Sequence, residues 1–367
     1  MVPPVPGLPE ARPGAAVPLA GLTTLGVGGP AERLVVSTDE AALIAAVRDA
    51  DAAGRPLLVL GGGSNLVVGD GPLAGDVVVV RTRGTADADG AAEDGTARVL
   101  RTVAAGEPWD AVVAASVADG LAGLECLSGI PGATGATPIQ NVGAYGQEVA
   151  DTVVAVRTLD RRTGTVGTLG ARELRFAYRD SALKGRADHL VLDVTFALRP
   201  SGLGGPVRYG ELARAVGAQA GDHVPAAELR EAVLALRRGK GMVLDPEDPD
   251  TRSAGSFFTN PLLDDAGLAA LRARVAERLG PDEVPPVYPG DDGRSKTSAA
   301  WLIERAGFAK GHARGGAAIS SKHTLALTSR GGGASDLLAL AHEVADGVEA
   351  AFGVALHPEP VFVGVRW

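Results

Sequence analysis

The chain contains one cysteine, Cys126, among its 367 residues, so no disulfide can form within it. Aromatic residues make up only 4% of the sequence, which leaves small aliphatic side chains to build the core. No uninterrupted apolar run reaches the roughly 18 residues that a membrane-spanning helix needs. The N-terminal segment MVPPVPGLPEARPG also lacks the apolar stretch of a signal peptide. These absences favour a cytoplasmic protein with no membrane partner.

The chain also has no excess of basic residues. The 35 Lys and Arg residues are outnumbered by 44 Asp and Glu residues, and the formal net charge is −9. Because phosphate backbones repel such a chain, we expect no nucleic-acid partner. The six histidines are scattered without an i, i+4 pair, and a lone cysteine cannot build a thiolate site, so we expect no metal.

The remaining sequence alternates between strand-like and helix-like segments, and its length predicts two or three domains. Ser37 followed by Glu40 predicts a capping box for a helix after strand 33–37. Apolar residues at helical spacing predict a helix over 334–352. The acidic, turn-rich segment 84–96 predicts an exposed hairpin tip or linker.

Two glycine-rich loops carry the clearest chemical signal. Strand LLVL runs into GGGSN at 61–65, and a longer loop, SGIPGATGATPIQNVGAYGQEV, covers 128–149. Glycine lets backbone N–H groups approach an anion closely, so the two loops predict a cradle for a diphosphate and hence a nucleotide cofactor. Neither loop ends in Gly-Lys-Ser/Thr, and neither opens a helix as a G-x-G-x-x-G fingerprint should.

Three shorter motifs hold candidate reactive side chains, and each has a plainer interpretation. Arg179 of YRDS could grip a carboxylate with two hydrogen bonds or form a surface ion pair with Asp180. Ser256 of AGSFFTNP could deliver a proton in a locally apolar site or lie in a simple turn. Glu359 of LHPEP, held between two prolines, could be a directed carboxylate or a solvated loop residue. The residues alone leave these alternatives open.

Seven motifs in order along the chain resemble one known family. VGGPAE, LGGGSN, GIPGATGATPIQNVGAYGQEV, YRDS, RYGEL, AGSFFTNP and LHPEP together resemble the UDP-N-acetylenolpyruvoylglucosamine reductases, or MurB flavoenzymes, of peptidoglycan synthesis. The resemblance runs from about residue 20 to the end. RYGEL after YRDS indicates the type of family member that closes a tyrosine loop over its substrate, and the glycine-rich run 201–206 would allow that loop to move.

The resemblance implies a mixed α+β and α/β fold. It consists of a two-domain FAD-binding module of the vanillyl-alcohol-oxidase-like (PCMH) type and a C-terminal α+β substrate domain. We therefore expect a disordered tail over 1–17, FAD-binding subdomains over 18–85 and 86–238, a substrate domain over 239–354, and a segment over 355–367 that returns to the FAD-binding part. We also expect a monomer.

The resemblance also implies a role for each matched residue. Arg179, Ser256 and Glu359 would be catalytic. Non-covalent FAD would contact the two loops at Gly61, Gly62, Gly63, Ser64, Asn65, Leu66, Gly129, Ile130, Gly132, Thr134, Gly135, Asn141 and Gly143. Substrate would contact Tyr209, Arg237, Lys240, Asn260 and His323. Glu304 is undecided between a substrate contact and a helix cap.

The implied reaction is that of a UDP-N-acetylmuramate dehydrogenase. NADPH, the co-substrate, supplies a hydride that FAD passes to C3 of the enolpyruvyl group of UDP-N-acetylglucosamine enolpyruvate, and Ser256 protonates C2. One alternative is an FAD-dependent alcohol or hydroxy-acid oxidase or dehydrogenase of the same fold. Another is a non-catalytic nucleotide-sugar sensor, against which the joint presence of Arg179, Ser256 and Glu359 argues.

Overall fold

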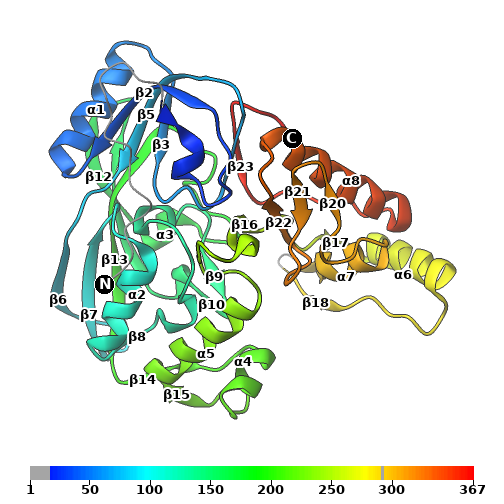
Figure 1. Cartoon of the computed structure of the whole chain (residues 1–367). Helices are drawn as coiled ribbons and strands as arrows, with labels where there is room; N and C mark the ends of the chain where they lie inside the picture. The colour runs from blue at the N-terminus through cyan, green and yellow to red at the C-terminus, as the bar shows by residue number, and fades with distance from the viewer. Residues whose placement is uncertain (1–16, 291–292) are drawn as a thin grey trace. The chain divides into compact units, whose positions relative to one another are not determined.

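The computed structural model describes residues 17–290 and 293–367, so most of the predicted tail 1–17 lies outside it. The chain divides into two compact units. The first holds Ala31–Gly63 and Ala74–Gly239, and the second holds Pro18–Pro30, Ser64–Leu73 and Lys240–Trp367. Both contain helices and strands, as expected for a mixed fold (Figure 1). The functional division into five segments stays a prediction.

Two sheets form the framework of the first unit. A four-stranded sheet has the order β1-β2-β5-β3, with β3 and β5 parallel. An antiparallel sheet has the order β12-β11-β13-β7-β6, and the short β8 pairs with the end of β13. The main elements are β1 (Val17–Pro18), β2 (Pro30–Ser37), α1 (Glu40–Ala52), β3 (Leu57–Leu60), β5 (Leu73–Val80), β6 (Thr85–Ala91), β7 (Ala97–Ala104), α2 (Trp109–Ala118), β8 (Leu121–Ala122), β9 (Gly143–Ala144), β10 (Gln147–Glu148), β11 (Val153–Asp160), β12 (Thr165–Gly170), α3 (Ala171–Leu174), β13 (His189–Pro200), β14 (Leu203–Pro206), α4 (Gly210–Ala215), β15 (His223–Pro225) and α5 (Ala226–Gly239).

The core of the first unit forms where α2 covers the antiparallel sheet. The Trp109 ring of α2 lies 5.6 Å from the ring of Phe196 on β13, and both side chains are fully buried. Alternate residues of β13, including Val194 and Leu198, are buried with Phe196. Each such side chain stabilises the fold by about 1.5–3 kcal/mol relative to exposure. The small aliphatic residues that the composition favours do supply most of this core.

The second unit is built around the long helix α8 (Ala334–Phe352), which covers a small antiparallel sheet in Figure 1. Its residues Leu337, Ala341, Val344, Val348 and Phe352 form one buried face, as their spacing predicted. The other elements are β4 (Leu66–Val68), β16 (Ser253–Ser256), β17 (Leu262–Leu263), α6 (Asp265–Leu279), β18 (Val287–Pro289), β19 (Ser295–Thr297), α7 (Ala299–Arg305), β20 (Ala313–Arg314), β21 (Ala317–Ile319), β22 (Ala326–Ser329) and β23 (Val361–Val363).

Two local expectations differ from the structure. Asp39, rather than Ser37, caps α1, and its Oδ1 accepts a hydrogen bond from the N–H of Ala42 at 2.8 Å. Ser37 is instead the last residue of β2 and is buried. The acidic segment 84–96 contains a strand, β6, which pairs with β7 along its whole length, so only its distal end is a hairpin tip.

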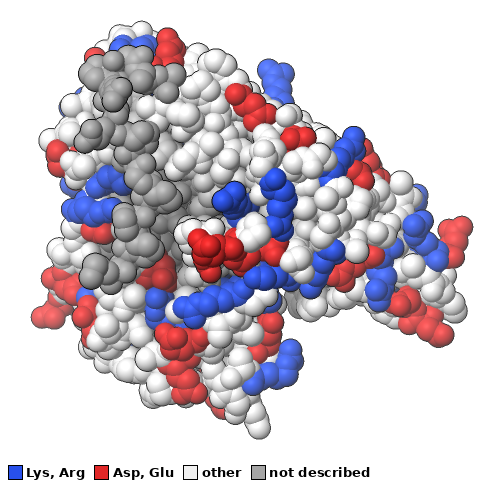
Figure 2. Space-filling model, in the orientation of Figure 1, with Lys and Arg blue, Asp and Glu red and all other residues white. Residues whose placement is uncertain are grey.

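No helix of the described residues is long and apolar enough to cross a membrane. Lys and Arg side chains are interspersed with Asp and Glu over the face drawn in Figure 2. This mixture agrees with the modest negative charge of the chain.

Candidate active site

The two glycine-rich loops meet inside the first unit. A Cβ placed on Gly62 would lie 2.4 Å from the Cα of Gly132, and one placed on Gly61 would lie 3.3 Å from the Cβ of Ala133. Gly63 has φ +63°, a left-handed conformation that other residues adopt at a cost. The contact therefore depends on glycine at these positions. In the described chain, the backbone N–H groups of Gly62 and Gly63 donate to no protein acceptor, which suits an anion cradle.

The second loop is fastened to the start of α2. The N–H of Gly129 donates to Oδ1 of Asp110 at 2.6 Å, and the N–H of Trp109 donates to the carbonyl of Gly132 at 3.1 Å. Arg230 of α5 donates to both Asp110 oxygens, at 2.6 and 3.0 Å. Burial would raise the pKa of Asp110, but these hydrogen bonds outweigh it and hold the pKa below its usual value. Asp110 therefore stays ionised and keeps Gly129 in place.

Some amides of the second loop are already bonded within the protein. The N–H groups of Thr134 and Gly135 donate to the carbonyls of Glu107 and Ala105, each at 2.9 Å. A Cβ on Gly135 would lie 2.5 Å from the Cβ of Ala105. These two predicted cofactor residues shape the loop through backbone packing. The partly buried Ile130 packs against the core of the same unit.

Arg179 is held against the second loop by a chain of hydrogen bonds. Its Nη2 donates to the carbonyl of Gly143 at 2.6 Å, and its Nη1 lies 3.9 Å from Oε1 of Glu148. Asn141 is 1% exposed and donates from Nδ2 to Oε2 of Glu148 at 2.7 Å. The structure thus joins Arg179, Asn141 and Gly143, as the sequence predicted for one site, and the Arg179 guanidinium pairs with Glu148.

Backbone strain marks the same place. The described residues other than glycine with positive φ are Asn141, Tyr145, Arg175 and Arg179. Three of these four belong to the second loop or to YRDS. A left-handed non-glycine residue costs roughly 1–3 kcal/mol and persists only where the surroundings enforce it, most often at functional sites. The strain therefore supports a functional role for this cluster.

Tyr209 and Arg237 also lie in the first unit. Tyr209 is 46% exposed as a residue, and its ring packs edge-on against that of Tyr145, with 5.5 Å between ring centroids. The glycine-rich run before it is more ordered than expected, because Leu203–Pro206 forms β14 and pairs with β15. Arg237 is almost fully buried at the end of α5, and this burial lowers its pKa to about 10. Arg237 therefore keeps its positive charge at neutral pH.

The second unit brings Ser256 and Glu359 together. Ser256 ends β16 opposite Ala326, directly before the buried Phe257. The N–H of Glu359 donates to the carbonyl of Phe257 at 2.9 Å, and Nδ2 of Asn65 donates to the carbonyl of Glu359 at 3.3 Å. Leu66 begins β4, which pairs in parallel with β23 just after Glu359. Three segments far apart in the sequence therefore hold the backbones at Phe257, directly after Ser256, and at Glu359 close together.

The other predicted residues of the second unit have varied surroundings. Oδ1 of Asn260 accepts from the N–H of Ala299 at 3.0 Å, which fixes its amide at the start of α7. The half-buried His323 lies in the tight turn before β22, where its carbonyl accepts from Ala326. Glu304 accepts from the hydroxyl of Thr324 at 2.5 Å, and the helix cap of α7 is Ser298, so Glu304 is not a cap. Lys240 and Ser64 also belong to this unit.

Sequence reasoning missed three residues that support the site. Asp110 anchors Gly129, Glu148 bridges Asn141 and Arg179, and Arg81 donates to the carbonyl of Gly61 at 3.0 Å. Glu148 stood inside the quoted loop and could have been considered. Asp110 and Arg81 lie outside every motif, and only the fold brings them to the loops. Among the described residues there is no cluster of three or more metal-ligating side chains.

Comparisons with known proteins agree along nearly the whole chain. Residues 246–363 match the family model for the C-terminal domain of UDP-N-acetylenolpyruvoylglucosamine reductase, and residues 31–170 match an FAD binding domain. The UDP-N-acetylenolpyruvoylglucosamine reductase of Thermobifida fusca is 58% identical over 352 residues, covering 95% of this chain and 97% of that protein. The protein of the same name from Mycobacterium tuberculosis is 50% identical over 363 residues, covering 95% of each.

The chain belongs to the UDP-N-acetylenolpyruvoylglucosamine reductase family. The crystal structure of the family member from Thermus caldophilus agrees, with 26% identity, a TM-score of 0.61, and coverage of 95% of this chain and 98% of that chain. The predicted fold is confirmed as a PCMH-type FAD-binding module with a C-terminal domain, and FAD is its cofactor. The family assignment from the seven motifs is likewise confirmed.

The contact between the glycine loops generates a testable prediction. In Gly62→Ala, the new Cβ would collide with the backbone of Gly132, and one loop must move. Overpacking costs about 1–3 kcal/mol, and 1.4 kcal/mol is a factor of ten, so we expect FAD binding to weaken about 10- to 100-fold. Flavin fluorescence titration of the apoprotein measures this. Gly167→Ala, on β12 with open space around it, is the matched control; equal affinity in both variants would contradict the prediction.

Proposed function

We propose that the chain is an NADPH-dependent flavoenzyme that reduces UDP-N-acetylglucosamine enolpyruvate to UDP-N-acetylmuramate, a precursor of peptidoglycan. The observation that carries the proposal is the near full-length match to reductases of that name, together with the ordered set of Arg179, Ser256 and Glu359. An alcohol or hydroxy-acid oxidase of the same fold would not need these three residues as a set. The monomeric state and cytoplasmic location stay predictions.

The cofactor residues fit a non-covalently bound FAD. The amides of Gly62 and Gly63 and the following Ser64, Asn65 and Leu66 would hold the pyrophosphate, while Gly129, Ile130, Gly132 and the loop as far as Gly143 would line the flavin. Cys126 lies just before this loop, but burial raises the pKa of its thiol to about 12. Because a covalent link needs a thiolate, Cys126 is a poor candidate for one. When bound, FAD supplies the hydride chemistry between NADPH and the enolpyruvyl group.

Arg179 would bind the substrate carboxylate and stabilise the enolate that forms from it. Its guanidinium is permanently charged, and the bond to the Gly143 carbonyl fixes its direction before substrate arrives. Such preorganisation matters because no reorganisation is then needed as charge develops. Glu359 would act on the same enolic group. Its N–H is bonded to the carbonyl of Phe257, and the φ angles of the flanking Pro358 and Pro360 are fixed by their rings, which restricts the backbone around Glu359.

Ser256 would donate the proton to C2. It is half-buried, and Gly255 before it has φ +75°, so the strand turns at a residue that only glycine fills without strain. The fully buried Phe257 and Phe258 pack edge-on, 5.2 Å apart, which makes the neighbourhood dry. Tyr209, Arg237, Lys240, Asn260 and His323 would contact the nucleotide and sugar parts of the substrate, and NADPH would use the same site in turn.

The visible spectrum of the purified protein tests the function directly. We expect the bands of oxidised flavin, their bleaching by NADPH, and their return on addition of UDP-N-acetylglucosamine enolpyruvate. The control is the same addition of UDP-N-acetylglucosamine, which has no enolpyruvyl group. Bleaching by a simple alcohol in place of NADPH would favour the oxidase alternative and overturn the proposal.

Removing the Ser256 hydroxyl should stop proton delivery and spare flavin reduction. For Ser256→Ala we expect NADPH to bleach the flavin at a near-normal rate, while product formation falls by about 10²–10⁴-fold, the usual cost of losing a general acid. Ser256→Cys keeps a proton donor and should recover part of the activity. Rapid mixing of reduced enzyme with substrate follows flavin and product separately. Product formation at the parent rate would assign the proton to another group.

Replacing Arg179 by Lys should be far from conservative. A point ammonium cannot give two parallel hydrogen bonds to a carboxylate, so the step that consumes the UDP-sugar should slow much more than flavin reduction by NADPH. Stopped-flow measurement of the two half-reactions makes the comparison. Arg175→Lys is a matched control, because Arg175 is exposed and also has a left-handed backbone. Equal slowing of both halves in the Arg179 variant would indicate a structural role.

A further inference from the structure

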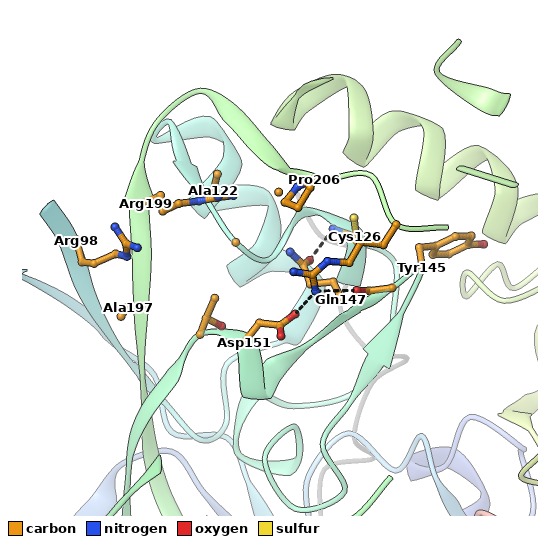
Figure 3. Close-up of a pocket in the computed structure, with 14 residues that line it drawn as sticks. Arg98, Ala122, Cys126, Tyr145, Gln147, Asp151, Ala197, Arg199 and Pro206 are labelled. Carbon is orange, nitrogen blue, oxygen red and sulfur yellow. Dashed lines mark hydrogen bonds and ion pairs between the residues drawn. The ribbon is translucent and has the colours of Figure 1, made fainter. Parts of the chain in front are cut away.

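The first unit contains a pocket that the proposed reaction does not use. Its volume is about 250 Å³, and its wall comes from β7, β8, β13, β14 with the segment after it, and the region of β10. Figure 3 shows Arg98 and Arg199 at one side of it and Cys126 and Gln147 at the other. Arg208 also lines the pocket. Three guanidinium groups therefore surround one cavity in a chain whose net charge is −9.

Two of these arginines are cross-strand neighbours. The antiparallel pairing of β13 with β7 runs from Asp193 opposite Ala104 to Leu198 opposite Val99. Arg199 and Arg98 are the next residues of these two strands, and both line the pocket. Like charges directly opposite on a sheet destabilise it. In the described part of the chain, the Arg199 side chain has no hydrogen bond or ion pair, and that of Arg98 donates only to the carbonyl of Ala97. No ion pair of the described residues therefore offsets the repulsion between these two guanidinium groups.

The acidic groups near the pocket are already engaged. Asp151 lies 3.8 Å from Nη1 of Arg208. Glu125, which is fully buried behind Gly205, accepts from the N–H groups of Gly123 and Gly205, each at 2.6 Å. Oε1 of the buried Gln147 accepts from the N–H of Cys126 at 2.9 Å. This bond fixes the amide, and among the described residues its Nε2 has no acceptor.

We propose that this pocket binds a small phosphate-bearing anion, held by Arg98, Arg199 and Gln147. Guanidinium groups give charge-assisted, two-pronged hydrogen bonds to phosphate oxygens, and a bound anion would remove the repulsion between the two strands. The fixed Nε2 of Gln147 supplies a further donor. The chemistry of the ligand is that of a diphosphate or phosphate group, whether it arrives free or as part of a nucleotide.

The position of the pocket couples it to the substrate loop; this step rests on the proposed function. Tyr145 lines the pocket and packs on Tyr209, and Arg208 directly precedes Tyr209 in the chain. An anion that draws Arg208 into the pocket would restrain the tyrosine that is proposed to close on the substrate. We therefore expect occupancy of the pocket to change the KM for the UDP-sugar and to leave flavin content unchanged.

Calorimetric titration of the FAD-bound protein with inorganic diphosphate, at constant ionic strength, tests the site. We expect saturable binding that weakens about tenfold or more in Arg199→Met and in Arg98→Met, because each loses charge-assisted hydrogen bonds. Arg172→Met, an exposed arginine of the same unit, is the matched control and should bind as the parent does. Equal binding by parent and both pocket variants, or no saturable binding by the parent, would overturn the proposal.

A second measurement distinguishes this pocket from the substrate site and tests the proposed function separately. The titration is repeated with saturating UDP-N-acetylglucosamine. Undisturbed binding of diphosphate supports an anion pocket apart from the substrate site, whereas displacement would show that diphosphate occupies the substrate site and would overturn the proposal. Turnover without added diphosphate is measured on the same samples, so a protein that binds diphosphate but does not turn over fails the proposed function alone.

Discussion

The close backbone approach of Gly62 to Gly132 is the constraint on which the cofactor site depends. With only 2.4 Å available for a Cβ, the two loops can form one surface only if glycine occupies the contact. In the described chain, that surface leaves the N–H groups of Gly62 and Gly63 without protein acceptors. The N–H groups of Thr134 and Gly135 instead donate to the carbonyls of Glu107 and Ala105. The same packing therefore decides which amides are left to meet an anion and which only hold the loop.

The proposed catalytic residues are held in place by different interactions in each unit. In the first unit, Asn141 and Arg179 have a left-handed backbone, and their side chains bond to Glu148 and to the carbonyl of Gly143. The cost of this backbone conformation is offset by the fixed orientation of the two side chains. In the second, no positive φ is needed at Ser256 or Glu359, because the bond between Glu359 and Phe257 and the pairing of β4 with β23 already fix them. In the second unit, pairing between short strands fixes the backbone, whereas in the first unit strained turns do so.

The sequence predicted features that are local or carried by a motif. The apolar spacing of 334–352 matches α8 from end to end, and the glycine loops pointed to the nucleotide cofactor. It failed where tertiary contacts decide between similar local options: Ser37 and Asp39 are both good caps, and only the length of β2 selects Asp39. The roles of Asp110 and Arg81, and the meeting of Arg98 and Arg199 at one pocket, depend on which elements become neighbours. No local sequence pattern encodes that.

An acidic chain that must recognise anions has to concentrate its positive charge. Arg237 shows how far this goes: burial lowers its pKa to about 10, with Tyr145 and Asp110 opposing the shift, so it remains a cation at pH 7 in surroundings of low polarity. A charge that is not screened by water acts more strongly on a bound phosphate. Arg98 and Arg199 follow the same principle near the ends of the inner strands β7 and β13, where strand pairing rather than burial brings both charges to one pocket. In both places the fold tolerates an electrostatic cost that a bound anion would relieve.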